Sequence, residues 1–313
     1  MRTECVLRCA LWLAGCLAWL AVAAQNSAPQ SRPSEQDYEN QVQGELDAGR
    51  LVSAENLARR AVADYPRSAG AYQLLGAVLF KSREADSARQ AFQSSLELDP
   101  KVAATYFDLA LVELSQDKYA DAVGPLEDCL RLEPRNAEAH LLLGRADHNL
   151  NRTLPAIDQF KQALQLSPRL PGAHYHLGYA YQSQGNLTSA LDEYRKEIEI
   201  DPSFYDAYWL AGNIELERGA VSAAEPLFRR AIELKPQGRP GHYGLARVLQ
   251  AENHLNDAEA ELKTILQGHP EDAEAHYTLA RVYQQMGRKA DAAREYQTVS
   301  MLHARTKTGA PQP

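Results

Sequence analysis

The sequence predicts an all-α fold, a solenoid of stacked helical hairpins, and the first observation behind this prediction is a regular spacing of prolines. Seven prolines of the 313-residue chain stand 34 residues apart without a slip. They are Pro66, Pro100, Pro134, Pro168, Pro202, Pro236 and Pro270. Prolines of unrelated turns would not keep one spacing, and a fixed period of roughly 20 to 50 residues is typical of proteins built from stacked repeats.

Two positions within each repeat are held by small residues. When the recurring proline is counted as position 32, position 8 is glycine or alanine in seven repeats and position 20 is alanine in all eight. The residues are Gly76, Ala110, Gly144, Gly178, Gly212, Ala246 and Ala280 at position 8, and Ala54, Ala88, Ala122, Ala156, Ala190, Ala224, Ala258 and Ala292 at position 20. Because such small side chains let two helices cross closely, we expect Gly178 to face Ala190 within one hairpin.

Helical periodicity and turn residues complete the prediction. Positions 4, 7, 8 and 11 are spaced for one face of a helix, and positions 20, 24 and 27 for a second. Between them, position 15 holds residues that tolerate the left-handed backbone of a tight turn. These residues are Gly49, Asp117, Asn151, Gly185, Gly219, Asn253 and Gly287. Proline at position 32 cannot continue the second helix, so each repeat is predicted to be a hairpin that buries its apolar faces against its neighbours.

This pattern resembles the tetratricopeptide repeat (TPR) family, which carries an aromatic at position 4, Leu at 7, Gly at 8, Tyr at 11, Ala at 20, Phe at 24, Ala at 27 and Pro at 32. Here position 7 is mostly leucine and position 24 is a large side chain. The resemblance implies a right-handed α-solenoid. The eight repeats are predicted at 35–68, 69–102, 103–136, 137–170, 171–204, 205–238, 239–272 and 273–306.

The first 24 residues lie outside the repeats and have the pattern of a secretory signal peptide. Arg2 and Arg8 precede an apolar run from Cys9 to Ala24, and Val22 and Ala24 form a small-x-small cleavage site. The run is 16 residues long, shorter than the roughly 20 residues of a membrane span. We therefore expect an exported protein, either periplasmic or secreted.

Two other fates of the N-terminus stay open. Leu13-Ala14-Gly15-Cys16 resembles a bacterial lipoprotein processing site, which would anchor the protein to a membrane through Cys16. An uncleaved signal would also act as a membrane anchor. Residues 25–34 are polar and are predicted to be a disordered lead-in, and residues 307–313 a disordered tail. The last second helix is expected over about 288–303 and acts as the cap of the array.

The composition excludes several classes of function. Lysine plus arginine number 33 and aspartate plus glutamate 41, a net charge of −8, and an acidic chain without a basic block is not expected to bind nucleic acid. Of four cysteines only Cys129 lies beyond the predicted signal peptide, so neither an intrachain disulfide nor a cysteine metal cluster is expected. The sequence contains no GxxxxGK[ST] loop, GxSxG elbow, HExxH or CxxCH motif. We expect no enzymatic activity, no metal and no cofactor.

Histidines and glutamates within the repeats were the remaining candidates for chemistry. Histidine recurs at position 4, where the related family carries a packed aromatic, and we interpret these histidines as packing residues. They are His140, His174, His242 and His276. His174 and His176 resemble a metal pair, but residues two apart on a helix point to different faces. Glu193 and Glu197 are interpreted as a solvated helix face, with a catalytic carboxylate pair as the remote alternative.

The candidate binding surface is the inner face of the solenoid, which the resemblance indicates is lined by the first helix of each repeat. The candidate residues are Phe107, Tyr175, Trp209, Tyr243 and Tyr277 at position 5, and Arg145, Tyr179, Asn213, Arg247 and Arg281 at position 9. Aromatic residues and arginine are enriched at recognition surfaces. The alternative is that the rings pack against the next repeat and that the arginines pair with carboxylates at position 2, which are Glu138, Asp206 and Glu274.

The sequence thus favours a protein-interaction scaffold that holds an extended peptide or a partner protein in its inner groove. Residues four apart on a helix share a face, so Tyr243 with Arg247 and Tyr277 with Arg281 are expected to form pairs there. An acidic ligand is expected across residues 205–285, and Trp209 is expected to be replaceable without unfolding. A cell-envelope glycan-binding or envelope-assembly factor, and a regulatory arm for a separate enzyme chain, are the alternatives.

Overall fold

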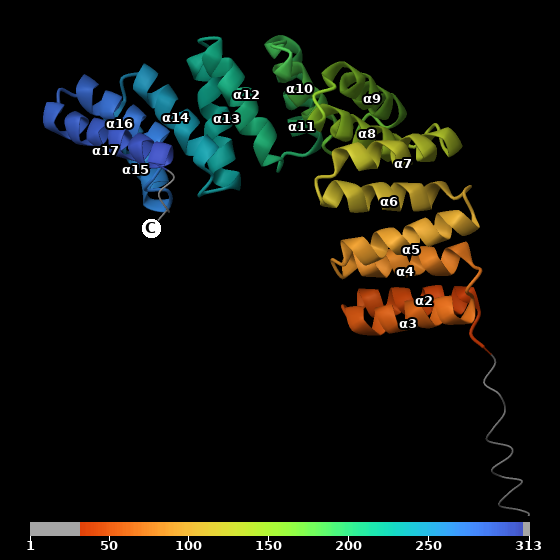
Figure 1. The fold of residues 1–313 in the computed structure, drawn as a ribbon. Helices are drawn as coiled ribbons and strands as arrows, with labels where there is room; N and C mark the ends of the chain where they lie inside the picture. The colour runs from red at the N-terminus through yellow and green to blue at the C-terminus, as the bar shows by residue number, and fades with distance from the viewer. Residues whose placement is uncertain (1–31, 309–313) are drawn as a thin grey trace, which may run out of the picture. The chain divides into compact units, whose positions relative to one another are not determined.

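The structure is a computed structural model that describes residues 32–308, and this range is helical apart from short connections (Figure 1). Within it lie sixteen helices and no strand. The helices are α2 (Glu35–Asp47), α3 (Leu51–Asp64), α4 (Ala69–Lys81), α5 (Ala85–Leu98), α6 (Ala103–Ser115), α7 (Tyr119–Leu132), α8 (Ala137–Asn149), α9 (Thr153–Leu166), α10 (Ala173–Ser183), α11 (Leu187–Ile200), α12 (Tyr205–Glu217), α13 (Val221–Leu234), α14 (Arg239–Ala251), α15 (Leu255–Gly268), α16 (Ala273–Gln285) and α17 (Lys289–Thr308). The predicted signal peptide, residues 1–24, lies outside the described residues.

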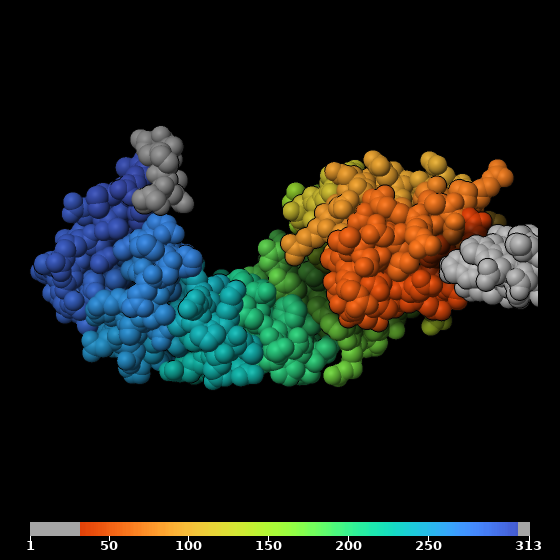
Figure 2. Space-filling view, turned by 90° about the horizontal axis from the view of Figure 1, so that it is seen from below, coloured from red at the N-terminus to blue at the C-terminus, as the bar shows by residue number. Residues whose placement is uncertain are grey.

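The described part of the chain divides into two compact units, residues 32–112 and 113–308. In the second unit, helices pack against the next helix along the chain and against the equivalent helix of the neighbouring hairpin. Figure 2 shows this order on the surface, where the colours from α8 to α17 follow one another without mixing. Each hairpin therefore contacts its chain neighbours, as expected of a repeat array.

The hairpins pack through the small and large positions that the sequence indicates. A Cβ added to Gly144 would lie 2.6 Å from the ring of Phe160, so the ring of position 24 rests directly on the glycine of position 8. A Cβ at Gly178 would lie 3.1 Å from the carbonyl oxygen of Ala190. The expected approach of Gly178 and Ala190 is confirmed.

The turns between paired helices all use the left-handed backbone predicted at position 15. Its φ angle runs from 56° at Asp117 to 76° at Gly219 and Gly287. Arg83 occupies this position in the second repeat and also has a positive φ, 64°, although arginine is not a residue type that indicates a left-handed turn. Two backbone hydrogen bonds hold this turn. The N–H of Arg83 donates to the carbonyl oxygen of Phe80 (3.0 Å), and the N–H of Glu84 donates to that of Leu79 (2.9 Å).

Both ends of the described range differ from the sequence prediction. Arg32 lies 3.3 Å from Asp64 and stacks over the ring of Tyr65 at 4.6 Å, and Ser34 caps α2. The predicted disordered lead-in therefore does not extend through residue 34, because its last residues dock on the first hairpin. Helix α17 continues to Thr308, past the predicted end at about residue 303 and into the predicted tail. None of the helices in residues 32–308 is both long and apolar enough to cross a membrane.

Candidate functional site

The candidate residues of the second unit lie on its first helices, α8, α10, α12, α14 and α16. We call positions 5 and 9 of these helices the first-helix face, because residues four apart share one side of a helix. The face comprises Leu141, Tyr175, Trp209, Tyr243 and Tyr277 at position 5, and Arg145, Tyr179, Asn213, Arg247 and Arg281 at position 9. The remaining candidate, Phe107, belongs to α6 in the first unit and is half-buried.

Position 5 is largely a packing position. Trp209 packs against the buried core around α11 and α12 and against the core of α13 to α16, while its indole N–H donates to Asp206 at 2.8 Å. The hydroxyl of Tyr243 lies 3.2 Å from that of Thr278 in the next repeat. Because Trp209 packs between hairpins, its replacement is expected to lower stability, whereas its replacement without unfolding stays a prediction.

Tyr175 is at the centre of a cluster of rings in α10 and its neighbours. Its ring centroid lies 4.9 Å from Phe204, 6.2 Å from Tyr194 and 6.3 Å from Tyr179. Burial raises the pKa of the Tyr175 hydroxyl to about 12, so it stays neutral at ordinary pH. Among the position-5 residues of the first-helix face, only Tyr277 is exposed, with 49% of its surface open to solvent.

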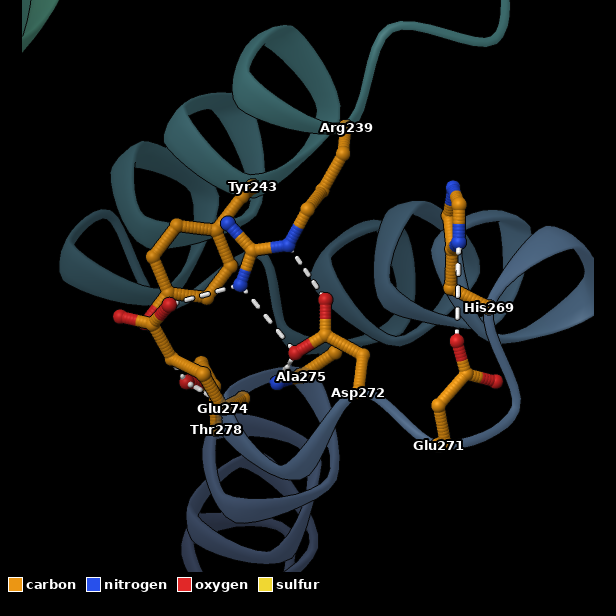
Figure 3. A network of polar contacts seen from close by, with 8 residues as sticks. All are labelled: Arg239, Tyr243, His269, Glu271, Asp272, Glu274, Ala275 and Thr278. Atoms are coloured by element: carbon orange, nitrogen blue, oxygen red, sulfur yellow. Dashed lines mark hydrogen bonds and ion pairs between the residues drawn. The ribbon is translucent and has the colours of Figure 1, made fainter. Parts of the chain in front are cut away.

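The arginine that lies over Tyr243 is Arg239, not Arg247 (Figure 3). The guanidinium of Arg239 lies 5.0 Å from the ring centroid, donates to both carboxylate oxygens of Asp272 and reaches Glu274 at 2.6 Å. The bond to Asp272 raises the pKa of Arg239. The expected pairing of Tyr243 with Arg247 is wrong because the guanidinium that lies over the ring is that of Arg239. Two carboxylates of the next repeat hold Arg239 there.

Position 9 differs from position 5, because the polar groups at the ends of its side chains form no hydrogen bond or ion pair among the described residues. Within residues 32–308, the guanidinium groups of Arg145, Arg247 and Arg281 make no hydrogen bond, ion pair or ring contact. The hydroxyl of Tyr179 is likewise without a hydrogen bond in this range, and its side chain is 44% exposed. Asn213 is half-buried.

The expected partners of these arginines are used elsewhere. Asp206 accepts from the indole of Trp209, and Glu274 accepts from Arg239. The ring of Tyr277 lies edge-on to Tyr296 at 5.9 Å rather than against Arg281. The predicted pair of Tyr277 with Arg281 is therefore not formed.

Glu193 and Glu197 are buried, so their interpretation as a solvated face is wrong. Glu197 is fully buried and accepts from the backbone N–H groups of Gly172 (2.8 Å) and Tyr175 (3.1 Å) at the start of α10. Glu193 accepts from Lys196 at 2.8 Å and faces a histidine of α10. Their partners stand up to 25 residues away in the chain, which is why the local pattern could not reveal them.

The histidines at position 4 have structural partners on both ring nitrogens. In the second unit, Nδ1 lies 2.5 Å from a glutamate at position 23 in three repeats, and Nε2 lies 2.9–3.2 Å from the carbonyl oxygen of the proline that ends the previous repeat. The pairs are His174 with Glu193, His242 with Glu261 and His276 with Glu295. Their interpretation as packing residues is confirmed, and among the described residues no three His, Cys, Asp or Glu side chains are arranged to hold a metal ion.

A cavity of about 410 Å³ opens beside Arg239 and His242, with Thr264 and His269 in its lining. Two polar groups of its lining are already bonded, the half-buried Arg239 to Asp272 and the buried His242 to Glu261. It therefore offers no free buried polar group to orient a ligand.

Family models of the tetratricopeptide repeat match much of the chain. One model, described as TPR repeat, matches residues 144–185. Two further models, each described as Tetratricopeptide repeat, match 215–267 and 251–306, and 40–103 and 177–239. Together they cover residues 40–103 and 144–306, well over half of the sequence. No curated protein sequence matches the chain.

Solved structures show the same fold. The crystal structure of MamA is 28% identical, with 54% of this chain and 92% of that chain covered and a TM-score of 0.50. YrrB, described as a TPR protein with an unusual peptide-binding site, is 22% identical, with 63% and 97% covered and a TM-score of 0.51. PilF of Pseudomonas aeruginosa is 18% identical, with 64% and 92% covered and a TM-score of 0.58. The fold is thus that of an all-α repeat solenoid.

Proposed function

This chain belongs to the tetratricopeptide repeat family, and from that premise we propose that it is a non-enzymatic scaffold that binds an extended segment of a partner protein on its first-helix face. The observation that carries the proposal is the contrast between positions 5 and 9. Trp209 and Tyr243 at position 5 are satisfied within the protein, whereas the guanidinium groups of Arg247 and Arg281 at position 9 make no hydrogen bond, ion pair or ring contact within residues 32–308. Polar groups that are held on a rigid helix and left unpaired are available to a partner.

Two further points support binding rather than catalysis. The buried carboxylates Glu193, Glu197 and Glu215 each have a structural partner, so none is left poised for proton transfer. Sugar recognition would favour open aromatic faces on successive repeats, but Trp209 and Tyr243 are packed between hairpins and only Tyr277 is an exposed ring at position 5 of the face. YrrB is described as having a peptide-binding site, but at 22% identity that likeness concerns the fold, and the proposal depends on the position-9 side chains instead.

We also propose that the protein is exported. The support is the sequence pattern of residues 1–24, in which a charged start precedes an apolar run and a small-x-small site. The exported protein is then expected to begin at Gln25, and an intact-mass measurement would show this. A diacylglyceryl mass on Cys16 would instead establish the lipoprotein alternative, and Met1 retained on soluble cytosolic protein would rule out export.

Site-specific photocrosslinking tests the scaffold proposal. Tyr277 is replaced by p-benzoylphenylalanine, which keeps an aromatic ring at an exposed position of the first-helix face, and the full chain is irradiated in its native cells. The matched control places the same residue at Gln162, which is exposed on the second helix α9. Discrete crosslinked species from position 277 and none from position 162 are expected. Equal crosslinking from both positions would exclude a binding site confined to this face.

A further inference from the structure

The three arginines of the first-helix face indicate the chemistry of the partner. Building on the proposed function, we infer that this face selects an acidic segment, one whose aspartate or glutamate side chains supply the missing counter-charges of Arg145, Arg247 and Arg281. The three residues share position 9 of α8, α14 and α16. They thus form one column on a single unit of the molecule rather than a scatter of surface charges.

Other arginines in the same unit provide a comparison. Six arginines within its other helices pair with carboxylates, whereas the exposed loop arginines Arg135 and Arg169 have no ion pair among the described residues. The pairs are Arg131–Asp128, Arg195–Glu215, Arg229–Glu225, Arg230–Glu233, Arg239–Asp272 and Arg294–Asp291. In a chain with 41 acidic and 33 basic side chains, carboxylates are plentiful, so three unpaired arginines at one repeat position call for an external partner.

Two of the three carboxylates expected at position 2 are engaged elsewhere and do not compensate the column. Asp206 at position 2 of α12 is bonded to an indole N–H, and Glu274 at position 2 of α16 is bonded to Arg239. Position 2 also lies about two helical turns from position 9. The charge of Arg145 also acts on a neighbouring side chain. Burial is the main cause that lowers the pKa of His176, and the charge of Arg145 is the second.

An acidic ligand suits these groups chemically. Guanidinium presents its N–H donors in a fork that matches the two oxygens of a carboxylate, and such charge-assisted bonds are stronger than neutral ones. Between Arg145 on α8 and Arg247 on α14, position 9 is neutral, with Tyr179 on α10 and Asn213 on α12. The favoured segment therefore has carboxylates toward both ends and a neutral middle. Three helix spacings of about 10 Å correspond to roughly nine extended residues.

A pair of peptides tests the inference. One fluorescein-labelled peptide of about twelve residues carries two glutamates at each end of an uncharged extended middle, and the other has glutamine at those places. Binding to the full chain is followed by anisotropy. The glutamate peptide is expected to bind at least roughly tenfold more tightly, the scale of one charge-assisted hydrogen bond, and its affinity is expected to fall as salt is raised.

Two double variants with the same change in net charge locate the effect. Arg247→Gln with Arg281→Gln removes part of the column and is expected to weaken the glutamate peptide roughly tenfold or more. Arg135→Gln with Arg169→Gln removes two exposed loop arginines that also lack ion pairs within the described residues, and is expected to change affinity by less than about twofold.

The outcomes separate the inference from the proposed function. Equal binding of both peptides, weakened by Tyr277→Ala, would overturn the preference for acidic groups and leave the scaffold intact. Equal losses in the two double variants would also overturn it, because net charge rather than the column would then be responsible. No binding of either peptide would overturn the inference as well, whereas the scaffold would still be judged by crosslinking at position 277.

Discussion

Hairpins α10–α11 and α14–α15 follow one repeat pattern in the same unit, yet the junctions of their first helices differ: that of α10 is polar and lies within its own hairpin, whereas that of α14 is apolar and lies against the preceding hairpin. At position 27, α11 has the fully buried carboxylate of Glu197, which bonds to two backbone N–H groups at the start of α10. The equivalent residue of α15 is Ile265, part of an apolar core. There, Gly244 is so close to the ring of Phe228 that a Cβ would clash with it.

The difference follows from how each first helix begins. Pro171 and Gly172, whose φ is +75°, delay the start of α10 to Ala173 and leave N–H groups that need an acceptor within the protein. Helix α14 begins at Arg239 and has Pro240 in its first turn, which has no N–H to satisfy. The same fold therefore accepts a polar or an apolar junction, provided that backbone groups are bonded and volume is filled.

The largest expected effect comes from removing the polar junction. Glu197→Ala introduces the alanine found at this position in other repeats, such as Ala163 and Ala231. Two buried N–H groups then lose a charged acceptor, so we expect a loss of about 3 kcal/mol in unfolding free energy. Denaturant unfolding measures the total, and hydrogen exchange should place the loss in α10 and its neighbours.

Glu197→Gln provides the matched comparison. It keeps one carbonyl oxygen and nearly the same volume, so a smaller loss of about 1 kcal/mol is expected. Wild-type stability in the alanine variant would show that the buried carboxylate does not cap α10.

The next effect comes from crowding the apolar junction. Gly244→Ala places a methyl group against the fully buried ring of Phe228, and we expect about 1–3 kcal/mol of destabilisation from overpacking. Gly268→Ala at the end of α15 is the control, since a Cβ there meets nothing within 4 Å. The control is expected to be neutral or stabilising by up to about 1 kcal/mol. Equal thermal unfolding of the two variants would contradict the tight junction.

A change of pH is expected to alter the stability of the two hairpins by a smaller amount per pH unit, and with opposite signs. Burial, with Arg145 and His148 adding to it, lowers the pKa of His176 in α10 to about 3. The unfolded chain binds this proton near pH 6.5, so stability from the neutral ring is present above about pH 6.5 and falls by about 1.4 kcal/mol per pH unit below it. His176→Gln should remove this loss in α10–α11.

The bond to Glu261 raises the pKa of His242 in α14, although burial opposes the rise and the Pro236 carbonyl adds to it. Its contribution is therefore fully present below the unfolded pKa and is lost as pH rises through the folded pKa. Hydrogen exchange corrected for intrinsic rates, measured on both sides of neutrality, should show α14–α15 gaining protection on acidification while α10–α11 loses it. His242→Gln should abolish that gain, and an unchanged pH profile would refute the assignment.

The sequence alone was sufficient for the features that depend on local geometry. Gly178 and Ala190, the turn at Asn151 and the ring of Phe160 all occupy the places that their repeat positions predict. The reason is that helix periodicity, left-handed turns and close crossings are set by residues within one hairpin. A repeat that departs from the pattern at one position can be interpreted from the equivalent position in the other repeats. Arg83, which adopts the same turn, is one such exception that the neighbouring repeats would have exposed.

Partners that are distant in the sequence, within one repeat or in the next, were decided only by the tertiary structure. The sequence predicted Arg247 beside Tyr243 because the two are four residues apart on one helix. In the structure the guanidinium of Arg239, which is bonded to Asp272 of the next repeat, lies over that ring. Glu197 looked solvated because nothing near it in sequence indicates that it meets Gly172. A helical pattern fixes which side a residue faces, whereas its neighbour depends on how adjacent hairpins are rotated and on which of several nearby groups binds it most strongly.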